Sequence, residues 1–204
     1  MYYCPSCAAR QLGAFHGLGV AATIWQSWIM RDKAQIRESR PDDLPMLEQL
    51  YRSAFPEEEL VPLLRQLLAE SEGVLSLVAV LQGEVVGHVC FTACTAGEGG
   101  AHIALLAPLA VDPDHQRRGL GGGLVHAGLE ASRAKGAIAC CVLGDPNYYS
   151  RFGFEAETGI EAPDPLPAEW HGAWQSLGLV DPAPAIAGKL SVPAPWQKRE
   201  LWTE

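Results

Sequence analysis

The order of apolar runs along the chain predicts one α/β domain, of the α+β type, in which helices cover both faces of a mixed sheet. Two β-branched runs, residues 74–81 and 84–92, flank a short turn containing Gly83 and predict an antiparallel hairpin. A later strand, helix and strand follow one another at lengths typical of a parallel crossover. The 204 residues are enough for one such domain with a sizeable core.

The first part of this domain is expected to supply one strand and two helices. Residues 36–39 predict a short strand. Pro41 followed by two aspartates signals a helix start, because proline is pre-set for a first turn and carboxylates stabilise the positive helix end. Apolar residues then recur at helical spacing up to residue 54. A second helix is expected over residues 57–70, with Pro62 in its first turns, where a missing N–H is tolerated.

The second part is expected to hold a loop over 95–100, a strand over 102–111, a helix over 120–135 and a buried strand over 137–143. A proline-rich tail of loops and short strands follows. We therefore predict an N-terminal extension (1–34), a central domain (35–160) and a C-terminal segment that completes this domain (161–204).

The N-terminal stretch has several interpretations. Residues 12–30 carry no charged side chain, but they are poor in membrane-type hydrophobicity. Met30 resembles a natural start, so an extension outside the fold is the first interpretation, a packed helix the second and a membrane anchor the third. Cys4 and Cys7 form a lone CxxC with only His16 nearby, fewer ligands than a structural zinc site uses. No metal site is predicted.

The composition narrows the class of partner and the compartment. A formal net charge of -9 argues against nucleic acid as a partner and tolerates a cationic amine. Cys140 and Cys141 lie inside an apolar run, which favours buried thiols in a reducing compartment and hence a cytoplasmic protein.

A polar, glycine-rich turn leads from the strand over 102–111 into the next helix. Its residues are Gln116, Arg117, Arg118, Gly119, Leu120, Gly121 and Gly122. The first turn of a helix has unpaired N–H groups and a partial positive charge, so it binds anions. Glycines leave this backbone open to a pyrophosphate and the arginines add positive charge, although solvated loop charges are the alternative for the arginines.

Two other phosphate-binding loops are excluded by the residues present. A Walker loop ends in Gly-Lys-Ser/Thr, which this turn lacks. A dinucleotide fingerprint counted from Gly119 would need its third glycine where Leu124 stands, and no acidic ribose partner follows at the expected distance.

Residues 116–121, QRRGLG, are similar to the Q/R-x-x-G-x-G/A motif of the GNAT superfamily of N-acetyltransferases. Residues 144–155, GDPNYYSRFGFE, resemble the segment that follows the fifth strand of that family. With LAPLAV at 106–111, they resemble one bacterial subgroup, over residues 36–154 in all. The resemblance implies the GNAT fold, with strands four and five splayed apart. It also implies acetyl-CoA as co-substrate and direct attack by an amine.

The resemblance also assigns roles to particular residues. The backbone of Leu109, Ala110 and Val111 would pair with the pantetheine arm, and Pro108 fits a bulge in this strand. Tyr149 would be the general acid for the leaving thiolate, with packing or a hydrogen bond to the cofactor as its plainer role. Asn147 fits a cofactor contact and a turn residue equally well.

No residue is singled out as the general base. Glu57, Glu58 and Glu59 lie between the first two helices, where a solvated helix start explains them equally. His88 and His102 each have a structural interpretation as strand residues. Water or a backbone carbonyl is a further alternative.

The predicted function is thus transfer of an acetyl group to an amine of a small molecule or peptide. A non-catalytic acyl-CoA-binding regulatory domain of the same fold is the first alternative. A membrane-tethered interaction protein led by residues 12–30 is the second. The acceptor and the oligomeric state, a homodimer included, stay open at this point.

Overall fold

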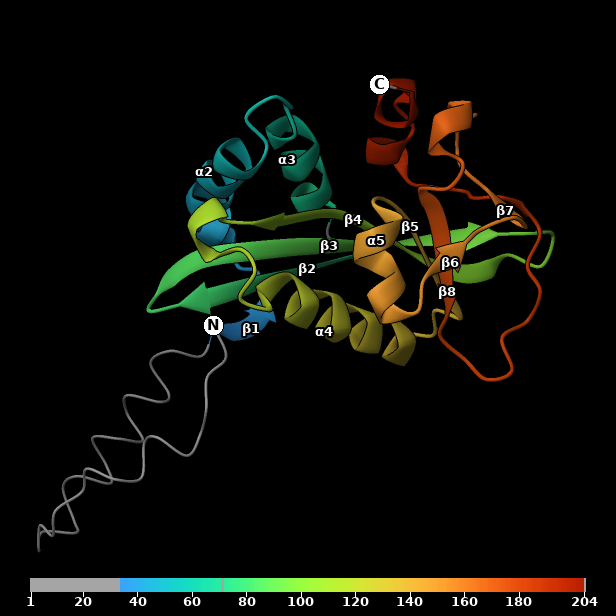
Figure 1. The fold of residues 1–204 in the computed structure, drawn as a ribbon, viewed down its shortest axis with the longest axis horizontal. Coiled ribbons are helices and arrows are strands. Elements are labelled where there is room, and N and C mark those ends of the chain that lie inside the picture. The colour runs from blue at the N-terminus through green and yellow to red at the C-terminus, as the bar shows by residue number, and fades with distance from the viewer. Residues whose placement is uncertain (1–33, 71, 204) are drawn as a thin grey trace, which may run out of the picture.

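A computed structural model describes residues 34–70 and 72–203 (Figure 1). The predictions made for residues 1–33, including the CxxC pair and the apolar stretch, lie outside these residues.

One mixed sheet forms the centre of the molecule, in the strand order β1-β2-β3-β4-β5-β8-β6. Its strands are β1 (Gln35–Glu38), β2 (Val74–Leu81), β3 (Glu84–Ala96), β4 (Ala101–Val111), β5 (Ala139–Leu143), β6 (Glu155–Ala156) and β8 (Trp174–Gly178). The pair β4–β5 is parallel and the other neighbours are antiparallel. The hairpin and the parallel crossover predicted from the sequence are therefore confirmed.

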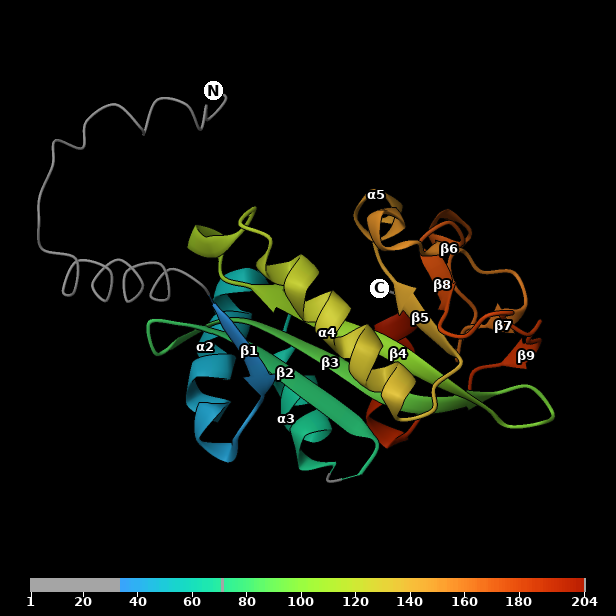
Figure 2. The same cartoon turned by 90° about the horizontal axis from the view of Figure 1, so that it is seen from below.

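Helices cover both faces of this sheet (Figures 1 and 2). One face carries α4 (Leu120–Ala134), and the opposite face carries α2 (Leu44–Ala54) and α3 (Val61–Ala69). The short helix α5 (Pro146–Tyr149) follows β5 directly. The remaining elements are short: η2 (Pro41–Asp43), η3 (Pro113–His115), η4 (Ser150–Phe152), β7 (Ile160–Glu161), η5 (Ala168–Trp170), β9 (Gly188–Lys189), η6 (Ala194–Trp196) and η7 (Arg199–Trp202).

Helix α4 lies on the sheet at very short distance because one of its residues has no side chain. A Cβ at Gly128 would clash with the ring of Phe91 on β3. The helix also buries Leu124 and Val125 against the sheet. This close contact fixes the line along which the N-terminal end of α4 points.

Three predicted boundaries are wrong for identifiable reasons. The second helix begins at Val61 rather than residue 57, because the ring of Pro62 conflicts with the carbonyl four residues earlier and prevents extension backwards. Residues 95 and 96 belong to β3 instead of a loop, since Thr95 pairs with His102 and lengthens the hairpin. The buried strand begins at Ala139, two residues later than expected.

Strands β4 and β5 separate after a short stretch of pairing. Only Ile103, Ala104 and Leu105 of β4 face β5, opposite residues 139–141. Beyond that point β4 pairs with β3 alone, and β5 pairs with β8. The register between β3 and β4 also shifts where Ala107 and Pro108 stand opposite Cys90, which is the bulge that the proline predicted. The two strands therefore part beyond this pairing, which is the splay that the family resemblance implies, and the space between their unpaired ends is called the β4–β5 gap below.

Candidate functional site

The loop before α4 presents an open backbone at the head of that gap. Gly119 adopts a left-handed conformation (φ 82°), and no side chain caps the first turn of the helix. A Cβ at Gly119 would meet nothing within 4 Å, so the space beside this N-cap residue is open, and no capping side chain occupies the N–H groups of the first turn. Leu120 continues this turn as the first helical residue and is half-buried. It also borders a separate cavity of about 680 Å³, which β1 and the β2–β3 hairpin bound and which no residue of β4, β5 or α5 lines.

Arg117 and Arg118 add charge to this loop. Both side chains are exposed, and neither takes part in an ion pair among the described residues. Arg117 itself has a positive φ of 59°, a conformation that turns the chain sharply into the helix. The two guanidinium groups are therefore free to meet an anion at the helix end.

The turn that leaves β4 is held by its own side chains. The Gln116 amide donates a hydrogen bond to the carbonyl of Val111 at 3.2 Å. Asp112 accepts from the backbone N–H of Asp114 and contacts Nδ1 of His115, each at 3.0 Å. Gln116, predicted to bind the cofactor, thus has a structural contact that fixes the loop to the strand.

The last residues of β4 have one free backbone edge. Leu109, Ala110 and Val111 pair with residues 87–89 of β3, and no strand among the described residues pairs with them on the side of the gap. A backbone edge in this state can accept an extended amide-bearing chain as an added strand.

The segment after β5 places two tyrosines beside the gap. Tyr149 is 8% exposed and packs in the α4-side core, with its ring 5.7 Å from that of Phe154. Its hydroxyl has no hydrogen bond to any described residue, and burial raises the pKa of this phenol well above its usual value. The close approach of its ring explains Gly144, where a Cβ would clash with it.

The two segments that carry the sequence motifs touch each other at the N-terminus of α4. A Cβ at Gly121 would lie 2.5 Å from the hydroxyl oxygen of Tyr148, and one at Gly122 would lie 3.7 Å from the ring of Phe152. These two glycines therefore admit the aromatic side chains as well as exposing backbone. From the sequence these glycines were expected only to leave room for a pyrophosphate. Their contact with Tyr148 and Phe152 was not predicted, because α4 and β5 separate the two segments along the chain.

One contribution to this contact was not predicted. The guanidinium of Arg151 lies 4.1 Å from the centre of the Tyr148 ring, and its Nε donates to the Tyr148 carbonyl at 2.8 Å. A cation over an aromatic face is a favourable contact. Asn147, by comparison, donates from both its backbone N–H and its side-chain amide to Asp145, which is the geometry of a turn residue.

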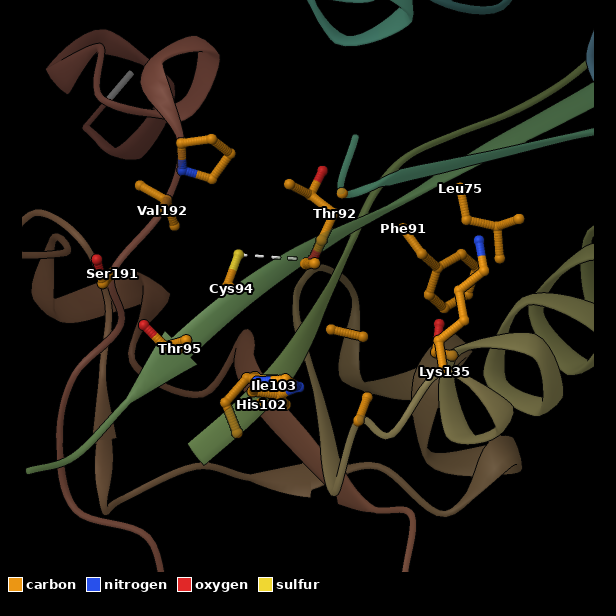
Figure 3. A pocket seen from close by; sticks show the side chains of 16 residues that line it. Leu75, Phe91, Thr92, Cys94, Thr95, His102, Ile103, Lys135, Ser191 and Val192 are labelled. Carbon is orange, nitrogen blue, oxygen red and sulfur yellow. Dashed lines mark hydrogen bonds between the residues drawn. The ribbon is translucent and has the colours of Figure 1, made fainter. Parts of the chain in front are cut away.

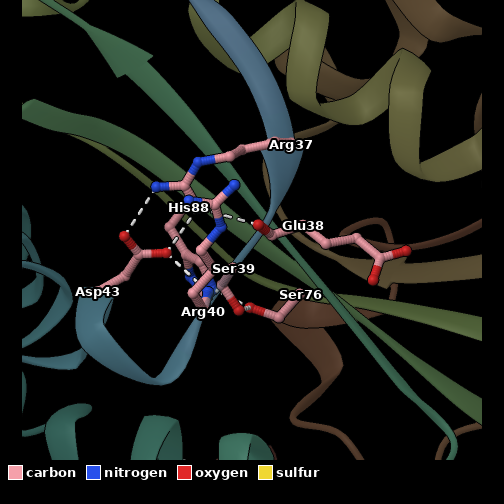
Figure 4. Close-up of polar contacts among 7 residues, drawn as sticks. All are labelled: Arg37, Glu38, Ser39, Arg40, Asp43, Ser76 and His88. Atoms are coloured by element: carbon pink, nitrogen blue, oxygen red, sulfur yellow. Dashed lines mark hydrogen bonds and ion pairs between the residues drawn. The ribbon is translucent and has the colours of Figure 1, made fainter. Parts of the chain in front are cut away.

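The residues considered for a general base lie in different places. His88 is fully buried: Nδ1 lies 2.7 Å from the Tyr51 hydroxyl and Nε2 lies 2.8 Å from the Ser76 hydroxyl. Ser39 donates a further hydrogen bond to Ser76, beside the Arg37–Asp43 ion pair (Figure 4). Burial lowers the pKa of His88 to about 3, so it is neutral and structural.

The remaining candidates for the general base are His102 and the three glutamates at positions 57–59. His102 lies at the start of β4, at the end opposite the loop. The three glutamates lie exposed in the turn between α2 and α3. Among the described residues, no group of three or more His, Cys, Asp and Glu side chains is arranged to hold a metal ion.

A model of the acetyltransferase (GNAT) family matches residues 44–154, more than half of the chain and the whole of the site described above. The protein belongs to the GNAT family. Two curated relatives of this GNAT protein are the uncharacterized N-acetyltransferases YjhQ and YhbS of Escherichia coli. YjhQ is 39% identical over 121 residues, which cover 57% of this chain and 67% of YjhQ. YhbS is 35% identical over 152 residues, which cover 72% and 89% of the two chains.

Solved structures give the same assignment. The E. coli YhbS structure, determined in complex with CoA, matches 81% of this GNAT chain and 93% of its own, with a TM-score of 0.74 and 30% identity. A GNAT acetyltransferase from Brucella melitensis in complex with acetyl-CoA matches 79% and 97%, with a TM-score of 0.65 and 30% identity. None of the helices within residues 34–70 and 72–203 combines the length and the hydrophobicity that a membrane span requires.

Proposed function

We propose that this protein transfers an acetyl group from acetyl-CoA to the amine of a small molecule or peptide. The observation that carries the proposal is that three features lie along the β4–β5 gap: the uncapped first turn of α4, the free edge of β4, and the tyrosine pair 148–149 after β5, whose first member lies at Gly121 and Val111. These features would contact different parts of a CoA thioester: its phosphates, its amide-bearing arm and its sulfur, respectively. The complexes of YhbS with CoA and of the Brucella relative with acetyl-CoA support the choice of donor.

Binding would use mainly backbone groups. The N–H groups around Gly119, Leu120, Gly121 and Gly122 suit a pyrophosphate because the helix end is positive and uncapped. Arg117 and Arg118 would add charge from the loop, and Gln116 would keep the loop in place through the Val111 carbonyl. The edge formed by Leu109, Ala110 and Val111 would hold the pantetheine arm by strand-like pairing. Asn147 would contact the donor only if its amide left Asp145.

The reaction needs a proton for the departing sulfur. Acetyl-CoA supplies an activated acyl group as a thioester, to whose carbonyl carbon the amine nitrogen forms its new bond. Tyr149 holds a proton on a hydroxyl that has no partner among the described residues. It would donate this proton to the thiolate as the C–S bond breaks, while the proton released by the nitrogen passes to water. The gap would bring the reactants together, which lowers the entropic cost of reaction.

Calorimetric titration of the full chain with acetyl-CoA, CoA and ATP tests the binding step. We expect micromolar dissociation constants for acetyl-CoA and CoA and no heat from ATP. A panel of polyamines, amino sugars, aminoglycosides and peptide N-termini, followed by thiol release, then tests the transfer step. No binding by folded protein would refute the proposal. Binding without thiol release from any amine would instead favour a regulatory acyl-CoA-binding domain.

A further inference from the structure

A second cavity lies at the opposite end of α4 from the loop. Its volume is about 470 Å³, within the range of small-molecule sites. It is bounded by the C-terminal turns of α4, by β3 and the first residues of β4, and by the segment from Ser191 to Pro193. Since α4 has 15 residues and rises about 1.5 Å per residue, the two helix ends are roughly 20 Å apart.

This cavity is separate from the β4–β5 gap. The only stretch in which β4 and β5 pair, Ile103–Leu105 with Ala139–Cys141, closes the sheet between them. The cavity adjoins the start of β4, whereas the predicted acetyl-CoA residues Leu109, Ala110 and Val111 stand at its end. A ligand in one space therefore does not occupy the other.

The cavity has an apolar floor. Leu75, Phe91 and Ala104 line it and are all buried members of the α4-side core. In Figure 3 the side chains of Leu75, Phe91 and Lys135 are drawn on one flank of the cavity, and those of Ser191 and Val192 on the other. An apolar floor of this kind favours a ligand with a hydrocarbon or aromatic body.

Ser132 supplies a polar group that the protein itself leaves unused. This residue is only 6% exposed and lines the cavity, yet its hydroxyl has no hydrogen bond to any described residue. No fully buried side-chain oxygen or nitrogen in the described part of the chain lacks a partner. The Ser132 hydroxyl must therefore keep its contact with open space, and the space that this residue lines is the cavity. Such a group suits a ligand atom that hydrogen-bonds.

Lys135 supplies the charge. It is the C-cap residue at the end of α4, about one helical turn after Ser132, and it lines the same cavity. It takes part in no ion pair among the described residues. Lys135 is exposed, so its ammonium group stands at the rim of a cavity that also holds the Ser132 hydroxyl and an apolar floor. This combination selects against a cationic ligand and favours a single carboxylate.

We propose that this cavity is a second binding site, for a small monocarboxylate with an apolar body. Its carboxylate meets Lys135 and Ser132, and its body lies over Phe91 and Leu75. The site is independent of the acetyl donor, and neither the loop before α4 nor Tyr149 takes part in it.

Titration with 3-phenylpropionate, followed by calorimetry and by amide chemical shifts, tests this inference, with 3-phenylpropanamide as the uncharged control. We expect saturable binding of the acid in the millimolar range or tighter, at least tenfold weaker binding of the amide, and shifts at Phe91, Ser132 and Lys135. Lys135→Met should weaken the acid tenfold, whereas Lys198→Met, outside the cavity, should not. Ala137→Phe, which fills the cavity from its rim, should abolish binding.

Circular dichroism of each variant checks that the fold is kept. Gly119→Glu, which alters only the loop at the other end of α4, should bind the acid normally, so failure of the acetyl-CoA proposal would leave this test intact. Absence of saturable binding would overturn the inference. Equal binding of acid and amide, or unchanged binding in Lys135→Met and Ala137→Phe, would overturn it as well.

Discussion

Tyr148 and Tyr149 are neighbours in the chain with different surroundings. Tyr149 packs its ring in the core, and its hydroxyl, which has no hydrogen-bonding partner among the described residues, keeps some contact with open space. Tyr148 is instead half-buried between Gly121 and Arg151. Burial raises the pKa of both phenols, and the charge of Arg151 opposes this rise for Tyr148. The pair therefore offers a candidate proton donor and a matched control one residue away.

Tyr149→Phe should lower kcat by about 100-fold and leave the dissociation constant of acetyl-CoA within twofold, because only the proton donor is lost. Tyr148→Phe should keep kcat within a few-fold. Because the pKa of Tyr149 is raised, its hydroxyl stays protonated from pH 7 to 10, and deprotonation of this group should not reduce activity in that range. Steady-state kinetics on both variants provide the check, and an equal loss in the two would contradict the assigned role.

His88 gives a prediction about stability rather than activity. Its pKa in the folded protein is about 3, below the ordinary value of 6.5, so the unfolded chain takes up a proton first as the pH falls. The contribution of the neutral His88 to the free energy of unfolding is fully present above pH 6.5 and decreases as the pH falls below this value. One such group costs about 2 kcal/mol at pH 5, at about 1.4 kcal/mol per pH unit.

Urea unfolding at pH 7.5 and pH 5 measures this effect. His88→Gln should be less stable than the parent protein at pH 7.5. Its free energy of unfolding should, however, differ much less between pH 7.5 and pH 5. His102→Gln, at an exposed strand position, should keep it. A parent protein equally stable at both pH values would show that His88 is not held neutral.

At the scale of one element, α4 links packing to binding. Gly128 lets the helix lie against Phe91, while Gly121 and Gly122 let Tyr148 and Phe152 approach its first turn. Gly119 differs from all of these, because it needs a positive φ and has open space around it. It is therefore the glycine whose substitution should most directly affect a bound anion.

Gly119→Glu should weaken acetyl-CoA binding at least 100-fold, because a carboxylate enters the space of the phosphates. Gly136→Glu is the matched control at the other end of the same helix: it also has a positive φ, with nothing within 4 Å of a Cβ. Both variants carry similar backbone strain of about 1 kcal/mol. Calorimetry should find near-normal affinity only in Gly136→Glu, and normal affinity in Gly119→Glu would remove the site from this loop.

At the scale of the whole molecule, the C-terminal segment is part of the core. β8 pairs with β5 along all five residues of that strand. Trp174, Trp196 and Trp202 are buried together on the α3 side of the sheet. Trp196 also donates a hydrogen bond to the Thr92 hydroxyl of β3 at 3.0 Å.

Removal of residues 161–204 should therefore abolish cooperative folding, since β5 would lose one neighbour and its buried residues would meet water. A chain that begins at Ala34 should instead keep its melting temperature within a few degrees and its affinity for acetyl-CoA. Thermal unfolding of both forms tests the predicted division of the chain. A stable 1–160 fragment would contradict it.

The elements with strong local signals could be predicted from the sequence. Alternating and apolar runs fixed the central strands, Pro108 marked the bulge, and the glycines from 119 onward marked the uncapped start of α4. The family resemblance pointed to the same loop. These features depend on residues close together in the chain, where propensity and spacing act directly.

The tertiary structure decided what depends on distant residues. It brought Tyr148 to Gly121 and Phe152 to Gly122, and it inserted β8 between β5 and β6 although no motif marks that strand. It made His88 a buried neutral group by packing Tyr51 and Ser76 around it, and it formed the cavity beside Ser132 and Lys135. A single sequence does not encode such contacts locally, because they arise only when separate elements exclude water from a shared surface.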